Sequence, residues 1–167
     1  EHASNLLPWF ELADKLNLKI KYVELDSNHE VIIENVKKII SPKTKVISIA
    51  HVSNAIGDVR DIKAITNFAH QKNIFVLVDG AQSVPHMKTD VIRDDIDFLV
   101  FSAHKMLGPT GVGVLYGKKK YLEVMKPFSY GGGMNIRFES TKELEYKELP
   151  LRLEAGTRNI AGVLGFK

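Results

Sequence analysis

The chain has 167 residues, enough for one domain with a substantial core, and its 44% hydrophobic and 26% charged residues are typical of a globular protein. It contains no cysteine, which excludes disulfides and cysteine-ligated zinc, and it has no apolar run of about 18 residues that could span a membrane. The net charge of +3 comes from scattered basic residues, so we expect no nucleic-acid partner and interpret the one run, Lys118–Lys120, as a solvated helix start.

The two ends of the chain show neither a targeting sequence nor a typical start or stop. No signal peptide is visible, and the lack of cysteine is compatible with the reducing cytoplasm, where we expect the protein to reside. Because the chain opens at Glu1 rather than Met and stops at Lys167 without a closing signal, we expect it to be part of a longer protein.

The first third of the chain predicts a helix, a strand and a second helix. Apolar residues between positions 6 and 18 share one helical face, with Pro8 in the first turn, and we expect Trp9 and this face to lie in the core. Residues 20–25 alternate apolar and polar side chains, which predicts a half-buried strand. Helical spacing of isoleucine and valine returns over residues 32–40.

The middle of the chain alternates strands and helices. Residues 46–50 predict a strand, and Asp61 is expected to cap a helix that carries apolar residues up to Ala69. Apolar runs at 75–79 and 98–101 predict two more strands, and residues 111–116 predict another after a Gly-Pro turn. This alternation is typical of an α/β protein with a largely parallel sheet.

The pattern weakens after Phe128. We therefore assign residues 1–130 to the α/β core, and residues 131–167 to an irregular connection and the start of a following segment of the same domain.

Two charged residues stand at the ends of successive predicted strands. Asp79 ends one strand and Lys105 follows the next, and the carboxyl ends of neighbouring parallel strands open onto the edge where α/β proteins bind ligands. A pyridoxal phosphate enzyme needs this pair, because the lysine forms an imine with the aldehyde and the aspartate keeps the pyridine nitrogen protonated.

Each of the two residues has a simpler explanation when taken alone. Lys105 alone would be a solvated lysine, and Asp79 alone would suit a receiver-domain phosphoacceptor, a magnesium ligand or a ribose-binding residue. None of these alternatives accounts for the Gly-Ala-Gln that follows Asp79 together with the Ser-Ala-His that precedes Lys105.

Those motifs bring a resemblance that extends along the whole chain. The chain resembles class V aminotransferase-fold enzymes, and within them the SufS-like (group II) cysteine desulfurases. The matching segments are residues 1–5, 8–9, 51–54, 78–82, 102–105, 108–111 and 152–157. The resemblance implies the large domain of a fold type I pyridoxal phosphate-dependent transferase, with a mainly parallel sheet and helices on both faces. It covers the central, cofactor-binding part of such an enzyme.

The resemblance also implies a role for five residues around the cofactor ring. Lys105 would carry the pyridoxal 5'-phosphate and then move protons, and Asp79 would pair with the pyridine nitrogen. Gln82 would bond the phenolic oxygen, and Asn54 would contact the substrate–cofactor adduct near that oxygen or the carboxylate. His2 would stack on the ring and is a second candidate for proton transfer.

Three further residues would bind phosphate. Ser102 and His104 would hold the phosphate of the same subunit, and Thr157 would reach the phosphate of the partner in a homodimer. No metal site is expected, since the remaining histidines show no ligand spacing and are interpreted as structural: His29, His51, His70 and His86.

The activity implied is conversion of L-cysteine to L-alanine, with the sulfur held as an enzyme persulfide for an acceptor protein of iron–sulfur cluster assembly. The persulfide cysteine and the arginine for the substrate carboxylate belong to segments of the family outside this chain, so we expect the isolated fragment to be inactive. Two alternatives remain open: another class V reaction (a selenocysteine lyase, a kynureninase-like hydrolase or an aminotransferase), or a domain that binds the cofactor without turnover.

Overall fold

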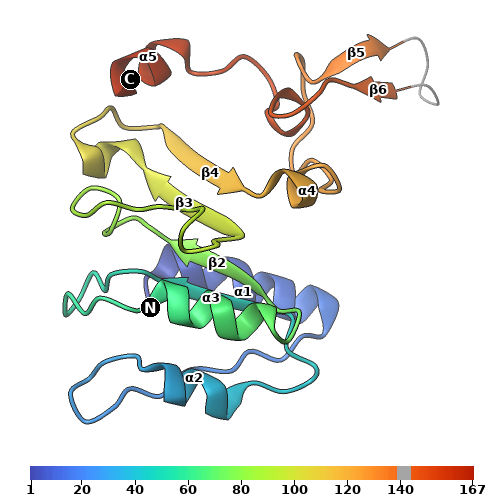
Figure 1. Cartoon of the computed structure of the whole chain (residues 1–167). Coiled ribbons are helices and arrows are strands. Elements are labelled where there is room, and N and C mark those ends of the chain that lie inside the picture. Colours follow the sequence, from blue (N-terminus) through green and yellow to red (C-terminus); the bar gives the residue numbers. More distant parts are fainter. Residues whose placement is uncertain (139–143) are drawn as a thin grey trace.

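A four-stranded sheet in the order β1-β2-β3-β4 forms the centre of the computed structural model, which describes residues 1–138 and 144–167 (Figure 1). Three strands run parallel: β1 (Val46–Ala50), β2 (Phe75–Asp79) and β3 (Phe98–Ser102). The last strand, β4 (Gly113–Gly117), runs antiparallel to β3. The predicted α/β architecture with a mainly parallel sheet is confirmed.

Alternating burial explains why the strands form where they do. Ile47 and Ile49 of β1 and Val76 and Val78 of β2 are buried, and they belong to one apolar core cluster. Helix α3 (Ile62–His70) contributes Ile62, Ile65 and Ala69 to the same cluster. The helix begins as predicted, because the side chain of Asp61 accepts a hydrogen bond from the backbone N of Ala64 at 2.9 Å.

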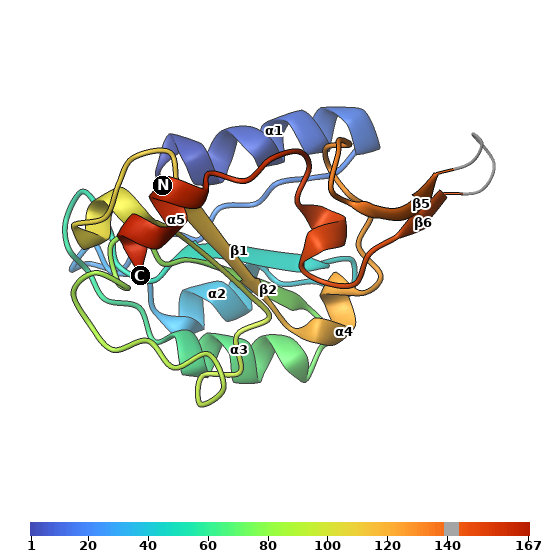
Figure 2. The ribbon, with the colours of Figure 1, turned by 90° about the horizontal axis from the view of Figure 1, so that it is seen from above.

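Helices cover both faces of the sheet, as Figure 2 shows. Helix α1 (Ala3–Leu16) lies on one face, and α2 (Ile33–Ile39) and α3 lie on the other. The Ser48 hydroxyl of β1 donates to Asn5 Oδ1 of α1 at 2.6 Å, which ties that helix to the sheet.

The structure corrects the prediction for α1 in two respects. The helix begins at Ala3, so Pro8 lies well inside it rather than in its first turn. Its apolar face is not core: Trp9 is half-buried, Leu7 is 57% exposed and Leu16 is 62% exposed. No residue of α1 is buried, so helical periodicity there predicted the helix but not its burial.

The strand predicted at residues 20–25 is also wrong. The segment belongs to no strand, although Lys21 Nζ donates to the Ile39 carbonyl and Asn35 Nδ2 donates to the Glu24 carbonyl. In the described part of the chain, β1 pairs only with β2, so this alternating segment has no ladder partner.

A cluster of four ionisable side chains lies at the amino-terminal ends of the parallel strands. His70 lies 2.9 Å from Asp95 and 2.8 Å from Asp97, and Lys118 lies 2.6 Å and 2.7 Å from the same two carboxylates. We call these four residues the charge cluster. Lys118 is therefore not the solvated residue that the lysine run predicted, since its side chain is 19% exposed; Lys119 and Lys120 are exposed and open the short helix α4 (Lys119–Leu122).

The last part of the chain is more regular than predicted. Strands β5 (Asn135–Phe138) and β6 (Leu144–Tyr146) form an antiparallel pair inside the segment predicted as irregular; the prediction for residues 139–143 lies outside the described residues. A 3-10 turn, η2 (Leu151–Leu153), and helix α5 (Ile160–Phe166) follow. The division at residue 130 stays a prediction.

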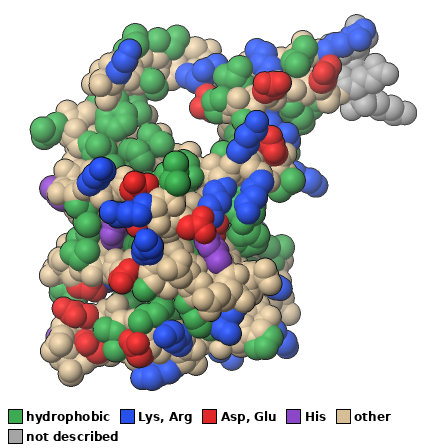
Figure 3. All heavy atoms as spheres, viewed as in Figure 1, with side chains coloured by type: hydrophobic (Ala, Val, Ile, Leu, Met, Phe, Trp, Pro, Cys, Tyr) green, Lys and Arg blue, Asp and Glu red, His purple; other side chains and the backbone are tan. Residues whose placement is uncertain are grey.

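Hydrophobic side chains gather on the surface near α5 (Figure 3). In α5 itself Ile160, Val163 and Leu164 are each more than half exposed. No helix within the described residues is both long enough and apolar enough to cross a membrane.

Candidate functional site

A small cleft opens at the carboxyl ends of the parallel strands and collects five of the predicted site residues. Asp79 sits opposite Ala50 of β1 and Val100 of β3, so it occupies the middle of this edge. The cleft is lined by His2, Ala50, Val52, Asn54, Asp79, Ala81, Gln82 and Lys105. Side chains as far apart in the sequence as His2 and Lys105 therefore line the same cleft.

Asp79 is fixed at the bottom of the cleft by the turn that follows β2. Its Oδ1 accepts a hydrogen bond from the backbone N of Ala81 at 2.9 Å, and Gly80 N donates to the Val100 carbonyl at 2.8 Å. A Cβ at Gly80 would lie 2.8 Å from Leu99 Cδ1, so any larger residue in this turn would have to displace the Leu99 side chain. The arrangement leaves Oδ2 of Asp79 for a donor in the cleft.

Lys105 is presented by a 3-10 turn, η1 (Ala103–Met106), that follows β3 directly. The turn is closed by Ala103, whose N donates to the Val112 carbonyl and whose carbonyl accepts from Gly108 N, both at 3.0 Å. Leu107 ends the turn in the left-handed region with a φ of 60°. Lys105 is half-buried and lines the same cleft as Asp79, as the sequence predicted.

His2 reaches the cleft from the start of α1. It is the N-cap residue of that helix, and its Nδ1 accepts a hydrogen bond from Ser4 N at 3.2 Å. Since Nδ1 accepts, the imidazole presents Nε2 for a contact with a ligand.

Asn54 and Gln82 enter from two loops. Asn54 is exposed on the loop after β1, where Ser53 Oγ accepts from the backbone N of Ala55 at 3.2 Å and of Ile56 at 3.1 Å. Gln82 follows β2 in the turn that begins with Gly80. The two amide side chains add neutral donors and acceptors to the cleft.

Three predicted site residues do not line this cleft. Ser102 ends β3 opposite Gly113, and His104 is exposed on the same turn as Lys105. Thr157 is exposed ahead of α5. Their phosphate-binding roles stay predictions.

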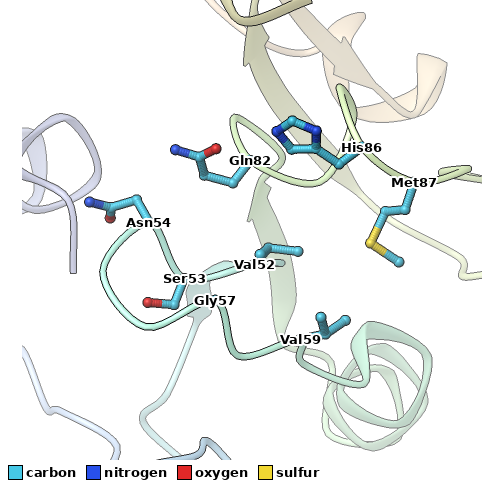
Figure 4. A pocket seen from close by; sticks show the side chains of 8 residues that line it. All are labelled: Val52, Ser53, Asn54, Gly57, Val59, Gln82, His86 and Met87. Carbon is cyan, nitrogen blue, oxygen red and sulfur yellow. The ribbon is translucent and has the colours of Figure 1, made fainter.

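A larger hollow adjoins the cleft and shares three residues with it. Figure 4 shows the loop that carries Ser53 and Asn54 on one side, and Gln82, His86 and Met87 on the other. The shared residues are Val52, Asn54 and Gln82. His86 was interpreted as structural, yet it is exposed and lines this hollow; its position four residues after Gln82 was the available signal.

The buried histidine that follows β1 has a lowered pKa. His51 donates its backbone N to the Asp79 carbonyl at 2.9 Å, and burial lowers the pKa of its imidazole despite the opposing charge of Asp94. Among the described residues, no group of three or more acidic or histidine side chains is arranged to hold a metal ion.

The family model for class-V aminotransferases matches residues 1–167. A probable cysteine desulfurase of Halalkalibacterium halodurans is 48% identical over 165 residues, which is 99% of this chain and 40% of that protein. A solved structure of the Escherichia coli cysteine desulfurase CsdA superposes with a TM-score of 0.95 at 38% identity, covering 99% of this chain and 41% of that one. The cysteine desulfurase of Thermococcus onnurineus gives a TM-score of 0.92 at 39% identity over 99% of this chain and 41% of that one. The chain thus spans about 40% of the length of the curated relatives it matches.

Proposed function

The chain belongs to the class-V aminotransferase family, and from that premise we propose that it forms the pyridoxal phosphate-binding part of a group II cysteine desulfurase. One observation carries the proposal: a single cleft at the carboxyl edge of the sheet brings Lys105 and Asp79 together with His2, Asn54 and Gln82. The similarity to cysteine desulfurases along 99% of the chain supports this activity over the other reactions of the family.

The residues of the cleft fit pyridoxal phosphate by their chemistry. The cleft holds a primary amine, two amides, an imidazole and a carboxylate of which one oxygen accepts from the backbone. The described residues include no group arranged to bind a metal ion that would compete with the cofactor. When bound, pyridoxal phosphate supplies an aldehyde for covalent attachment and a protonated ring that accepts electrons.

Each cleft residue has a defined task in this proposal. Lys105 Nζ is the amine that would hold the cofactor, and its free amine would move a proton at the substrate α carbon. Asp79 Oδ2 would accept a hydrogen bond from the ring nitrogen and keep it protonated, a charge-assisted bond worth about 1.5–3 kcal/mol. Gln82 would donate to the phenolic oxygen, Asn54 would contact the bound substrate and cofactor near that oxygen or the substrate carboxylate, and His2 would pack on the ring.

The sulfur is transferred to a residue outside this chain. The carbon–sulfur bond of L-cysteine breaks while a cysteine thiolate of the same protein forms a sulfur–sulfur bond with the departing atom, and the carbon skeleton leaves as L-alanine after protonation. The chain has no cysteine, so the accepting thiolate has to come from the remainder of the protein. On its own, the chain would bind the cofactor without desulfurating cysteine.

The same proposal includes the surroundings of the enzyme. We propose that the protein works in the cytoplasm as a homodimer, in which Thr157 reaches the partner's phosphate, and delivers sulfur to an acceptor protein of iron–sulfur cluster assembly. A related solved structure, at 29% identity and a TM-score of 0.80, is described as SspA in complex with cysteine, which supports cysteine as the substrate.

Spectroscopy of the whole protein tests the cofactor assignment. Addition of pyridoxal phosphate should produce a visible absorption band that Lys105→Ala abolishes and that Lys43→Ala, at an exposed lysine, leaves intact. A band that survives Lys105→Ala contradicts the assignment. Alanine release from L-cysteine by the whole protein tests the reaction, and a protein that binds the cofactor without releasing alanine would refute desulfuration.

A further inference from the structure

A buried arginine outside the cleft connects two of the segments that form it. Arg60 is 6% exposed and its guanidinium donates in three directions: to the Ala50 carbonyl at 3.0 Å, to Asp58 Oδ2 at 3.1 Å and to Glu1 Oε2 at 2.9 Å. These acceptors belong to the end of β1, to the loop that follows it and to the segment before α1. The rigid fork of a guanidinium suits such three-way bonding.

On one side, the network holds the residue next to His2. The Glu1 carboxylate accepts from Arg60 and also from the hydroxyl of Ser53. Burial alone would raise the pKa of Glu1, but the hydrogen bonds from Ser53 and Arg60 and the charge of Arg60 hold it below its ordinary value. Glu1 is therefore anchored as an anion, and His2 follows it directly as the cap of α1.

On the other side, the network holds the loop of Asn54. Ser53 is 3% exposed; its backbone N donates to the Asp58 carbonyl at 2.9 Å and its Oγ accepts from the amides of Ala55 and Ile56. The side chain of Asp58 is 6% exposed and pairs with Arg60. Hydrogen bonds at Ser53 and Asp58 therefore hold both ends of the turn that carries Asn54.

We infer that Arg60 is a positioning residue, whose guanidinium sets His2 and Asn54 relative to each other across the cleft. The inference rests on the proposed function, in which both side chains contact the bound cofactor or substrate. Arg60 touches neither ligand and acts through Glu1, Asp58 and the loop. Removing the guanidinium leaves two carboxylates without their shared cation, so both segments should loosen together.

The test compares Arg60→Met, Arg60→Lys and Glu1→Gln in the whole protein, with Lys63→Met as a control that removes an exposed cation from α3. Hydrogen exchange of the amides of Ser4, Ala55 and Ile56 should rise about tenfold in Arg60→Met, while the amides of β2 stay protected. The lysine-bound cofactor band should persist, but kcat/KM for L-cysteine should fall about tenfold. Arg60→Lys, with a single ammonium, should restore part of both changes, and Lys63→Met should change neither.

The outcomes separate the inference from the proposed function. A wild-type protein without a cofactor band refutes the function, whereas the exchange data still decide whether Arg60 couples the two segments. Unchanged exchange and unchanged kcat/KM in Arg60→Met overturn the inference, as does a parallel loss of the cofactor band, which would indicate general destabilisation. If Arg60→Met fails to fold, Glu1→Gln decides: faster exchange at Ser4 with lower kcat/KM supports the coupling, and wild-type values refute it.

Discussion

Replacing Asp97 with asparagine should destabilise the fold strongly, because this carboxylate is fully buried and meets three donors. Oδ2 accepts from Val76 N at 2.9 Å and lies 2.8 Å from His70 Nε2, while Oδ1 lies 2.7 Å from Lys118 Nζ. An asparagine side chain keeps one oxygen, but its NH2 group would face hydrogen-bond donors and it lacks the negative charge of the carboxylate. Breaking a buried ion pair costs about 3–5 kcal/mol, so Asp97→Asn should cost about that much.

Asp95 provides the matched control for this prediction. It pairs with the same two partners, but its side chain is 55% exposed where Asp97 is 0% exposed. Exposed ion pairs contribute at most about 1 kcal/mol, so Asp95→Asn should cost less than that.

Urea unfolding of the protein, followed by far-ultraviolet circular dichroism, measures both variants. With a slope of about 2 kcal/mol per molar urea, Asp97→Asn should lower the unfolding midpoint by about 1.5–2.5 M and Asp95→Asn by less than about 0.5 M. Equal losses for the two variants, or a loss below about 1 kcal/mol for Asp97→Asn, would refute the argument from burial.

Three other predictions concern packing, capping and pH. Gly108→Ala would place a methyl group 2.7 Å from the Phe166 ring and should cost about 1–3 kcal/mol in urea unfolding, with faster hydrogen exchange in α5; wild-type stability would contradict the close approach. Asp61→Ala should lower the free energy of unfolding by about 1 kcal/mol because the α3 cap is lost, whereas Asp61→Asn should keep most of the capping stabilisation. The hydrogen bond from Lys118 lowers the pKa of Asp95 from 3.8, so the ionised carboxylate stabilises the fold fully above about pH 4. This stabilisation is lost as the pH falls through the lower pKa that Asp95 has in the folded state. Asp95→Asn should flatten the decline of stability in acid, and an unchanged decline would contradict the ion pair.

Local signals in the sequence predicted much of the sheet. Residues 46–50 and 75–79 form strands with the predicted bounds, and Asp61 caps the helix that follows it. The meeting of Asp79 and Lys105 also followed from sequence, because parallel strands end at a common edge. These features depend on neighbours within a few residues or on one general rule of sheet topology.

The sequence did not predict features that depend on residues far away along the chain. Lys118 is partly buried because β4 returns antiparallel and brings it to Asp95 and Asp97, more than twenty residues earlier. Residues 20–25 alternate like a strand, but alternation does not supply a ladder partner. Arg60 carries no motif, and only the folded loop shows that it bonds to Glu1, 59 positions away.

The charge cluster and the cleft occupy opposite ends of the same parallel strands. His70 and Asp97 stand just before β2 and β3, whereas Asp79 and Lys105 stand at or beyond the ends of those strands. The charge cluster, which stabilises the sheet, therefore lies far from the residues of the cleft. Substitutions in the charge cluster should therefore change the stability of the fold without moving the residues of the cleft.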